Sequence, residues 1–301
     1  MTDHDNATSS SSNTPTSTRA KSRKTRVYAF REFLLETYGN YLGKETKSSN
    51  PLILDVAGGK GDLSWLFCNV DGIASVVLDP VGSVPRCAIP KSVNYLREHP
   101  EQGAARSVKG LPTYQPLAPL IAKLEGKDEF VTPPHLDVCL DQEFVQRIRC
   151  VVGKEGNADE EWSEFWSSRL REREGKNSKG NSQQRADTAI TEADTALQTI
   201  LDIELVVGFH PDQATDYCIE LANLLHIPWC IVPCCVFPAE FPHRRLQNGD
   251  RVRDYQQLIV YLREQHPEAK TGYLEFSFTE TAKNLVLYTT PADSNKRARA
   301  A

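Results

Sequence analysis

The sequence predicts an α/β protein built on a doubly wound, mostly parallel β-sheet that ends in an antiparallel pair of strands. The first observation is an apolar run, Leu52–Leu54, followed by Asp55, a glycine-rich turn and a helical pattern. The second is the alternation of short apolar runs with helical patterns along the chain, which is typical of parallel sheets. The third is a pair of consecutive strand patterns near the end, at 273–278 and 285–289.

Length and composition indicate one large intracellular domain. The 301 residues fit an α/β domain with an insertion, and the 40% hydrophobic content is enough for a sizeable core. The net charge of −5 excludes a global basic field for nucleic acid. Eight cysteines without the spacing of a disulfide framework indicate reduced thiols. We find no apolar run of membrane-spanning length and no secretory signal, so we expect a cytoplasmic or nuclear protein without a membrane partner.

The two ends of the chain are expected to lie outside the folded domain, which we place at 27–291. Residues 1–26 are rich in Ser, Thr and Asn and are predicted to be disordered. Their basic end, 19–26, suits a nuclear address or an RNA tether, although a solvated tail is the simpler interpretation. A helix is predicted over 27–38 and is expected to end at Gly39. Residues 292–301 are expected to be a loose tail.

The stretch 52–80 predicts the first half of a nucleotide-binding βαβ unit. Three glycines, Gly58, Gly59 and Gly61, follow the first strand and let the backbone approach a ligand closely. The helix start after Gly61 offers unpaired N–H groups to an anion. A second apolar run ends in Asp79, which is placed to bond both hydroxyls of a ribose.

The remaining elements follow in the order that a doubly wound sheet requires. The third strand is predicted at 136–140, with Asp141 at its carboxyl end. The other predictions are helices at 91–99, 143–152, 186–201 and 251–265, a helix that ends near 225, and strands at 203–208 and 228–232.

The segment 153–185 is predicted to be a polar surface insertion, partly disordered. Within it, Trp162, Phe165, Trp166 and Leu170 fall on one helical face. Such a face docks either on the domain or on a protein partner. We favour docking on the domain, because aromatic faces usually find a core.

The glycine turn resembles motif I of the class I S-adenosylmethionine-dependent methyltransferases. Asp55 stands inside the strand end and is followed by Gly-Gly-x-Gly, whereas a dinucleotide fingerprint would need Gly or Ala at Ser64. The resemblance implies a Rossmann-like sheet of the methyltransferase type, with S-adenosylmethionine as cofactor. It further implies that Asp55 and the glycines hold the methionine end of the cofactor and that the position of Asp141 meets the adenine.

Two further matches resemble the lineage of the tRNA acceptor-stem 2′-O-methyltransferases. They are Ala214-Thr215-Asp216 after the fourth strand and Cys234-Cys235 after the fifth. The chain departs from that lineage at 212–213, which replace Cys-Gly, and at 236–237, which replace histidines. It also lacks the Asn/Asp-Pro-Pro-Tyr motif of amino-group methylators. The resemblance implies an RNA substrate, with tRNA the first choice.

The loops after the fourth and fifth strands carry the candidate catalytic residues. His210 suits a general base, and Asp212 and Asp216 lie one helical turn apart, where they would flank an acceptor. Cys235 is a candidate nucleophile of the kind used in 5-methylcytosine formation. Each has a structural alternative: a hydrogen-bonded histidine, an acid at a helix start or a small packing cysteine.

The same loops contain candidate metal ligands and a cluster of basic residues. A zinc site from Cys230, Cys234, Cys235 and His243 is conceivable, but adjacent cysteines strain tetrahedral geometry, so we predict no metal. Arg244 and Arg245 belong to a basic cluster with His243, Arg251 and Arg253, which is expected on the pocket rim as an RNA phosphate site or as ordinary surface charge.

The sequence thus predicts a methyltransferase that uses S-adenosylmethionine and modifies RNA by in-line transfer of the methyl group. Two alternatives remain. An NAD-dependent oxidoreductase would share the βαβ unit and Asp79. A catalytically inactive adenosyl-binding module would instead hold partners through the insertion.

Overall fold

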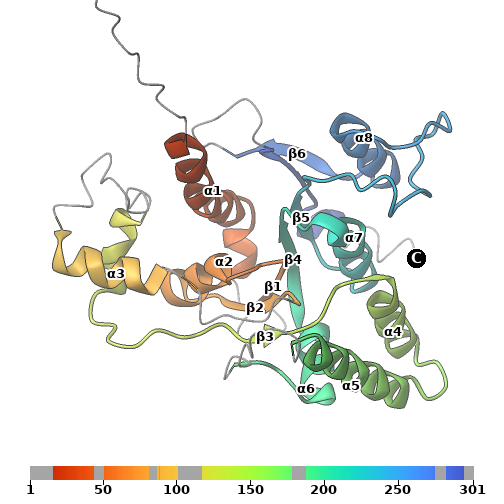
Figure 1. Cartoon of the computed structure of the whole chain (residues 1–301), viewed down its shortest axis with the longest axis horizontal. Coiled ribbons are helices and arrows are strands. Elements are labelled where there is room, and N and C mark those ends of the chain that lie inside the picture. The colour runs from red at the N-terminus through yellow and green to blue at the C-terminus, as the bar shows by residue number, and fades with distance from the viewer. Residues whose placement is uncertain are drawn as a thin grey trace, which may run out of the picture.

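A seven-stranded mixed sheet organises the chain, with helices on both of its faces (Figure 1). The computed structural model describes residues 16–43, 51–80, 87, 89–100, 117–177, 188–274 and 283–294. The strand order is β3-β2-β1-β4-β5-β7-β6. β1 to β5 are parallel, and β7 runs antiparallel to both of its neighbours, β5 and β6. The predicted α/β class, the mostly parallel sheet and the antiparallel end are therefore confirmed.

The central strands are short and almost completely buried, as expected for parallel strands covered on both faces. β1 pairs with β2 so that Asp55 faces Val77, and it pairs with β4 so that Asp55 faces Val207. The strands are β1 (Leu52–Val56), β2 (Ala74–Leu78), β3 (His135–Leu136), β4 (Ile203–Phe209), β5 (Trp229–Val232), β6 (Lys270–Tyr273) and β7 (Leu285–Tyr288).

The helices form two layers that receive alternate side chains of each strand. The α-helices are α1 (Thr16–Leu42), α2 (Asp62–Leu66), α3 (Ile89–Glu98), α4 (Gln142–Gly153), α5 (Ala158–Asn177), α6 (Ala193–Leu201), α7 (Thr215–Leu224) and α8 (Tyr255–Gln265). The structure also contains a π-helix, η1 (Phe67–Asp71), and the 3₁₀ helices η4 (Ala118–Leu124) and η5 (Asp212–Ala214).

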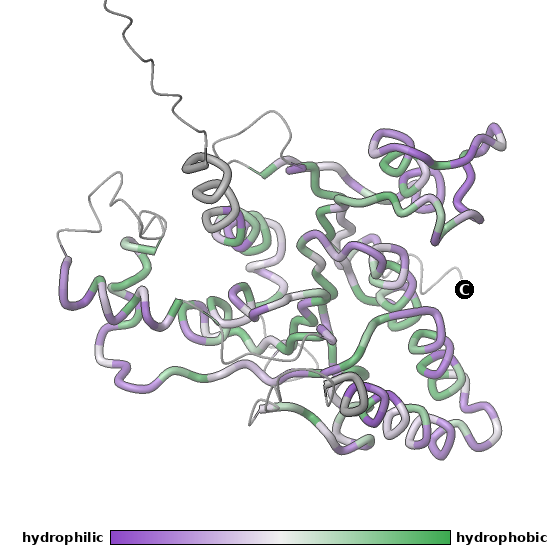
Figure 2. The backbone as a smooth tube through the Cα atoms, in the orientation of Figure 1, coloured by the Kyte–Doolittle hydropathy of each residue, from purple (hydrophilic) through white to green (hydrophobic). Residues whose placement is uncertain are grey.

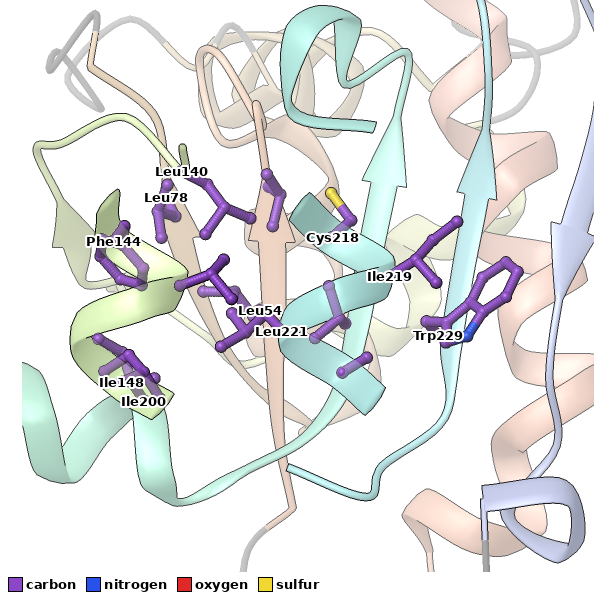
Figure 3. Packing of buried hydrophobic residues seen from close by; sticks show 14 of the residues in the cluster. Leu54, Leu78, Leu140, Phe144, Ile148, Ile200, Cys218, Ile219, Leu221 and Trp229 are labelled. Carbon is purple, nitrogen blue, oxygen red and sulfur yellow. The ribbon is translucent and has the colours of Figure 1, made fainter. Parts of the chain in front are cut away.

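Each face of the sheet has its own apolar core, because successive side chains of a strand point to opposite faces. Leu54 and Val56 pack with α4, α5, α6, α7 and α8 in the larger core, part of which Figure 3 shows. Ile53 points to the other face and packs with Phe30 and Leu34 of α1. A third cluster joins α2 and α3 around Trp65.

Helix α1 is longer than predicted at both ends. It begins at Thr16, inside the segment predicted to be a disordered tail, and it continues through Gly39 to Leu42. Glycine inside a helix costs only about 1 kcal/mol relative to alanine, which tertiary packing easily outweighs. Here Tyr38 is fully buried, and its hydroxyl donates to the backbone oxygens of Trp229 and Thr289. Residues 1–15 of the predicted tail lie outside the described residues.

Helix α5 fills the first part of the predicted insertion and belongs to the main core. Trp162 and Trp166 are both fully buried, and their ring centroids lie 5.6 Å apart. Their indole N–H groups donate to the backbone oxygens of Ala193 and Thr191, each at 2.9 Å. Docking of the aromatic face on the domain is therefore confirmed, and over this helix the segment is not a detachable surface loop. Residues 178–187 of the insertion lie outside the described residues.

Several predicted boundaries differ from the structure. β3 covers only His135–Leu136 instead of 136–140, α6 begins at Ala193 instead of 186, and β6 begins at Lys270 and ends at Tyr273, the first residue of the predicted 273–278. Residues 275–282 lie outside the described residues. Residues 291–294 are helical, so 292–294 are not part of a loose tail, and the rest of the predicted tail, 295–301, lies outside the described residues.

Hydropathy follows this layered arrangement (Figure 2). The central strands are coloured as hydrophobic, whereas much of α8 and of the loop before it is hydrophilic. Among the described residues, no helix has the length and apolarity that crossing a membrane requires.

Candidate functional site

The candidate site lies where the carboxyl ends of β1 and β4 meet. The strand order reverses between these two strands, since β2 and β3 continue on one side and β5 on the other. In open α/β sheets, the loops that leave such a point diverge and form a crevice for a ligand. The sequence places its glycine turn after β1 and its predicted catalytic residues after β4 and β5, so one edge of the sheet carries both.

The glycine turn has the backbone conformation of a close-approach loop. Gly59 and Gly61 have φ angles of +57° and +73°, and Ala57 before them has φ +54°. A Cβ atom on Gly58 would lie 2.6 Å from Oδ2 of Asp55, so any side chain would displace that carboxyl group. A Cβ atom on Gly59 would meet no atom within 4 Å, which leaves open space at the surface of the turn. The turn can therefore accept a ligand against its backbone.

Asp55 is held under the turn by a chain of hydroxyl groups. Its side chain is buried, and the Ser64 hydroxyl donates to its Oδ2 at 3.0 Å. The Ser75 hydroxyl in turn donates to the Ser64 oxygen at 2.9 Å. Burial raises the pKa of Asp55 to about 7, against the opposing hydrogen bond from Ser64. Ser64, which occupies the position of the third glycine in a dinucleotide fingerprint, therefore fixes the acid of the turn.

Asp79 links the turn to β2. Its Oδ2 accepts a hydrogen bond from the backbone N–H of Gly59 at 2.9 Å, and the residue is only 6% exposed. Its backbone oxygen lies 2.9 Å from Nε2 of the buried His135. The structure thus brings four predicted cofactor residues, Asp55, Gly58, Gly59 and Asp79, into one compact unit.

Asp141 has a structural partner of its own. It is the N-cap of α4, where its side chain accepts from the Phe144 N–H at 3.0 Å, and Arg169 of α5 pairs with it at 2.7 Å. Its expected contact with adenine stays a prediction. The acid directly after β3 is Asp137, which is 2% exposed and forms an ion pair with Arg173 of α5.

Asp137 and Arg173 were not predicted as site residues. The sequence predicts Asp137 inside a longer strand and Arg173 within a polar insertion. The sequence does carry a signal for Asp137, which is a carboxylate inside an otherwise apolar run. A buried acid of this kind needs a partner. The pair ties α5 to the carboxyl end of β3.

His210 follows β4 in a strained conformation. Its φ angle is +60°, and Asp212 two residues later has φ +46°. Non-glycine residues rarely adopt positive φ, and such strain concentrates at functional sites. Burial lowers the pKa of His210 to about 4, helped by the nearby charge of Arg26 on α1. His210 is therefore a neutral imidazole near pH 7, and its Nε2 is buried without a hydrogen-bond partner in the described part of the chain.

Asp212 meets the two cysteines that follow β5. The Cys234 thiol donates to Asp212 Oδ1 at 2.9 Å, and Cys235 is exposed beside it. Burial and a hydrogen bond with Asp212 raise the pKa of the Cys235 thiol, which lowers its fraction of thiolate. Cys230, by contrast, is fully buried within β5. The four-residue zinc set that included it is therefore not assembled.

Asp216 and Arg244 bind each other, and the surface position expected for Arg244 needs correction, whereas the catalytic role of Asp216 stays a prediction. Arg244 Nε donates to Asp216 Oδ2 at 2.8 Å, and Nη1 donates to the Val236 backbone oxygen at 2.8 Å. The guanidinium lies 3.8 Å from the centre of the Phe241 ring and its side chain is completely enclosed. Arg244 therefore cannot meet an RNA phosphate in this conformation, and it anchors the loop after β5 instead.

Three arginines of the predicted basic cluster remain at the surface. Residues 244–252 form a short hairpin, in which Arg245 pairs with Arg251 across an antiparallel bridge. Arg245, Arg251 and Arg253 are all exposed. These three residues are therefore at the surface after β5 and Arg244 is not, and their place on the rim of a pocket stays a prediction.

Comparison with known proteins adds no family assignment. No protein-family model matches the sequence, and a search of curated proteins finds no significant relative.

Proposed function

We propose that the chain binds S-adenosylmethionine at the glycine turn and transfers its methyl group to RNA. The observation that carries the proposal is the hydrogen bond between the Gly59 N–H and the Asp79 carboxylate. It joins an open glycine turn to an acid at the end of the next strand. In the resemblance stated above, these two elements hold the methionine and the ribose of the cofactor.

The environment of the turn fits such a cofactor. Gly58 can carry no side chain without displacing Asp55, and the position of Gly59 opens to free space. Asp79 places a carboxylate directly against the backbone of the turn, through the bond from the Gly59 N–H. The cofactor would supply a methyl group on a positively charged sulfur. The residues of the turn would bind and orient it.

Two observations favour this cofactor over NAD. In the usual dinucleotide fold the strand order is 3-2-1-4-5-6, with the sixth strand beside the fifth. Here β7 lies between β5 and β6 and is antiparallel to both. In addition, Ser64 replaces the small third residue of the dinucleotide fingerprint and bonds Asp55. The antiparallel end is the feature that the methyltransferase resemblance implies.

The acceptor side of the proposed reaction lies after β4 and β5. His210 is neutral near pH 7 and has a free ring nitrogen, so it can accept a proton or orient an acceptor hydroxyl. Asp212 lies beside it with an exposed carboxylate. In-line transfer requires mainly that donor and acceptor be aligned, and these residues would orient the acceptor. The raised pKa of Cys235 makes a thiolate nucleophile the weaker mechanism.

RNA is proposed as the acceptor on the basis of the exposed arginines and the lineage resemblance. Arg245, Arg251 and Arg253 present guanidinium groups on a hairpin that follows Cys235. Guanidinium groups suit bidentate contacts to phosphate. Ala214-Thr215-Asp216 and Cys234-Cys235 are the matches to the tRNA acceptor-stem 2′-O-methyltransferases.

The test is transfer of labelled methyl from S-adenosylmethionine to total cellular RNA and, in separate reactions, to total protein. We expect label in RNA. Replacing Arg245, Arg251 and Arg253 together by alanine should weaken RNA methylation and reduce its dependence on salt, because phosphate contacts release counterions. The exposed Arg171→Ala on α5 is the control. Label in protein alone would overturn the RNA assignment.

An inactive adenosyl-binding module is the second candidate. This candidate is favoured because two of the predicted catalytic acids already have partners. Asp216 is bound by Arg244, and Asp212 accepts a hydrogen bond from Cys234. In that case the cofactor would bind and neither pool would be labelled.

A further inference from the structure

We propose that Asp212, Cys234 and Cys235 form a binding site for one thiophilic divalent metal ion, with Zn²⁺ the best match. One ligand atom from each residue lies within 4.8 Å of the other two. The Cys234 sulfur is already 2.9 Å from Asp212 Oδ1. The site shares Asp212 with the acceptor side of the proposed methyl transfer and no residue with the glycine turn, and metal binding can be measured without methyl transfer.

The fold builds this cluster from two neighbouring strands. β4 and β5 are paired in parallel, with Phe209 opposite Val232, so the chain leaves both at the same edge of the sheet. Asp212 begins η5, and its positive φ angle of +46° turns the residue at that edge. Pro233 follows β5 and is buried, which fixes the backbone before the two cysteines. Residues 22 positions apart are thereby brought into contact.

The sequence argued against a metal because Cys234 and Cys235 are adjacent, but in the structure their spacing, with Asp212, is close to what a tetrahedral ion needs. With Zn–S distances of about 2.3 Å and Zn–O distances of about 2.1 Å, two ligand atoms at a tetrahedral angle lie about 3.6–3.8 Å apart. Ligand atoms that lie within 4.8 Å need only small side-chain rotations to reach this spacing. The hydrogen of the Cys234 thiol now lies between sulfur and carboxylate, where the ion would replace it.

The ligand set selects the class of metal. Two thiolates favour soft or borderline ions, and one carboxylate favours a divalent ion over Cu⁺. The three ligands would carry three negative charges, and the ammonium group of Lys283, 3.8 Å from the ring centre of Tyr255, interacts electrostatically with Cys235 and would offset part of them. Asp212 and Cys235 are exposed, so a fourth position is open to water or to a nitrogen or oxygen of a bound molecule.

The experiment titrates the chelator-stripped full chain with Zn²⁺ by calorimetry under a non-thiol reductant, and with Co²⁺ by absorption spectroscopy. We expect one bound ion, and for Co²⁺ a thiolate-to-metal charge-transfer band together with the strong visible bands of a tetrahedral site. Cys234→Ser and Cys235→Ser should each weaken binding by about a hundredfold or more and diminish the charge-transfer band, because the thiolates are ligands. Asp212→Asn should weaken binding and keep the charge-transfer band.

Cys150→Ser is the matched control, because Cys150 is a partly exposed cysteine on α4 outside the cluster. It should bind Zn²⁺ as the wild type does, and circular dichroism should show that all four variants are folded. Absence of Zn²⁺ binding to the folded wild type would overturn the proposal. So would unchanged binding in both Cys234→Ser and Cys235→Ser. Because the readout requires neither cofactor nor RNA, its failure is distinct from failure of the proposed function.

Discussion

Asp55 should make the stability of the protein fall as the pH rises, and Asp55→Asn should remove that effect. The folded-state pKa is about 7, against 3.8 for an ordinary aspartate, because the carboxyl group is buried. A group whose pKa is raised on folding stabilises the protein most below its unfolded pKa, and that contribution is lost as the pH rises through the folded pKa. Asparagine resembles the protonated acid, so it keeps the hydrogen bond with Ser64 without a charge to bury.

The magnitude follows from the two pKa values. The pKa of Asp55 is 3.8 in the unfolded chain and about 7 in the folded protein. The free energy of unfolding therefore falls by roughly 3 kcal/mol between pH 5 and pH 8. His210 acts in the opposite sense, since its pKa is lowered to about 4 and its contribution is lost as the pH falls below its unfolded value of 6.5. Comparing wild type with Asp55→Asn at each pH cancels the His210 contribution.

The assay is urea unfolding of the wild type and of Asp55→Asn at pH 5, 6, 7 and 8. We expect the variant to gain about 3 kcal/mol relative to wild type across this range. The exposed Asp202→Asn controls for exchange of a surface carboxylate for an amide. A constant difference between Asp55→Asn and wild type from pH 5 to pH 8 would refute the reasoning, because a buried carboxyl that ionises near neutrality cannot give one.

Three further predictions follow from the packing and from the acceptor side. Trp162→Ala should lower the free energy of unfolding by about 3–5 kcal/mol in urea titrations, because it opens a cavity in the main core; a loss below 1 kcal/mol would show that α5 is dispensable. Arg244→Ala should cost about 2–3 kcal/mol while Arg245→Ala costs almost nothing, and equal losses in the same titration would contradict the buried position of Arg244. Asp212→Ala should reduce methyl transfer by about two to four decades with little change in cofactor affinity, whereas Cys235→Ser should retain transfer unless the thiolate is a nucleophile; a wild-type rate in Asp212→Ala would remove that residue from the acceptor site.

Local patterns predicted the parts of the fold that depend on short-range chemistry. The elements from Leu52 to Asp79 could be predicted because an apolar run, a glycine turn and a helix start are neighbours in the sequence. The two tryptophans of α5 were readable because helical spacing places them on one face. In each case the residues that must act together are close along the chain.

The roles of residues whose contacts are distant in the sequence could not be predicted. Arg244 and Arg245 are identical neighbours in the sequence, yet one is enclosed by Phe241 and Asp216 and the other is exposed. Asp212 meets Cys234 only because β4 and β5 are adjacent in the sheet. Burial and ion pairing between elements are decided by tertiary packing, which single-sequence patterns do not encode.

At the end of β3, the alternating pattern of the sequence was given too much weight and the helix-cap signal of Asp141 too little. The alternation at 136–140 favoured a strand, but only two residues pair with β2, and the chain then turns to place Asp141 as the cap of α4. An aspartate just before a helical pattern is a strong cap signal. Asp137, which the predicted strand included, is the buried acid at this edge of the sheet, and it pairs with Arg173.

Binding of S-adenosylmethionine and of NAD, measured by calorimetry on the same preparations, tests the central claim most directly. Gly59→Arg should fold, because its Cβ meets open space and the positive φ angle costs only about 1–2 kcal/mol, but the side chain should fill the cofactor position and abolish binding. Gly72→Arg is the matched control, since Gly72 also has a positive φ angle and open space but precedes β2 at the opposite end of the strand. We predict that wild type and Gly72→Arg bind S-adenosylmethionine more tightly than NAD and that Gly59→Arg binds neither. Tighter binding of NAD, no binding to wild type, or unchanged binding to Gly59→Arg would contradict the account.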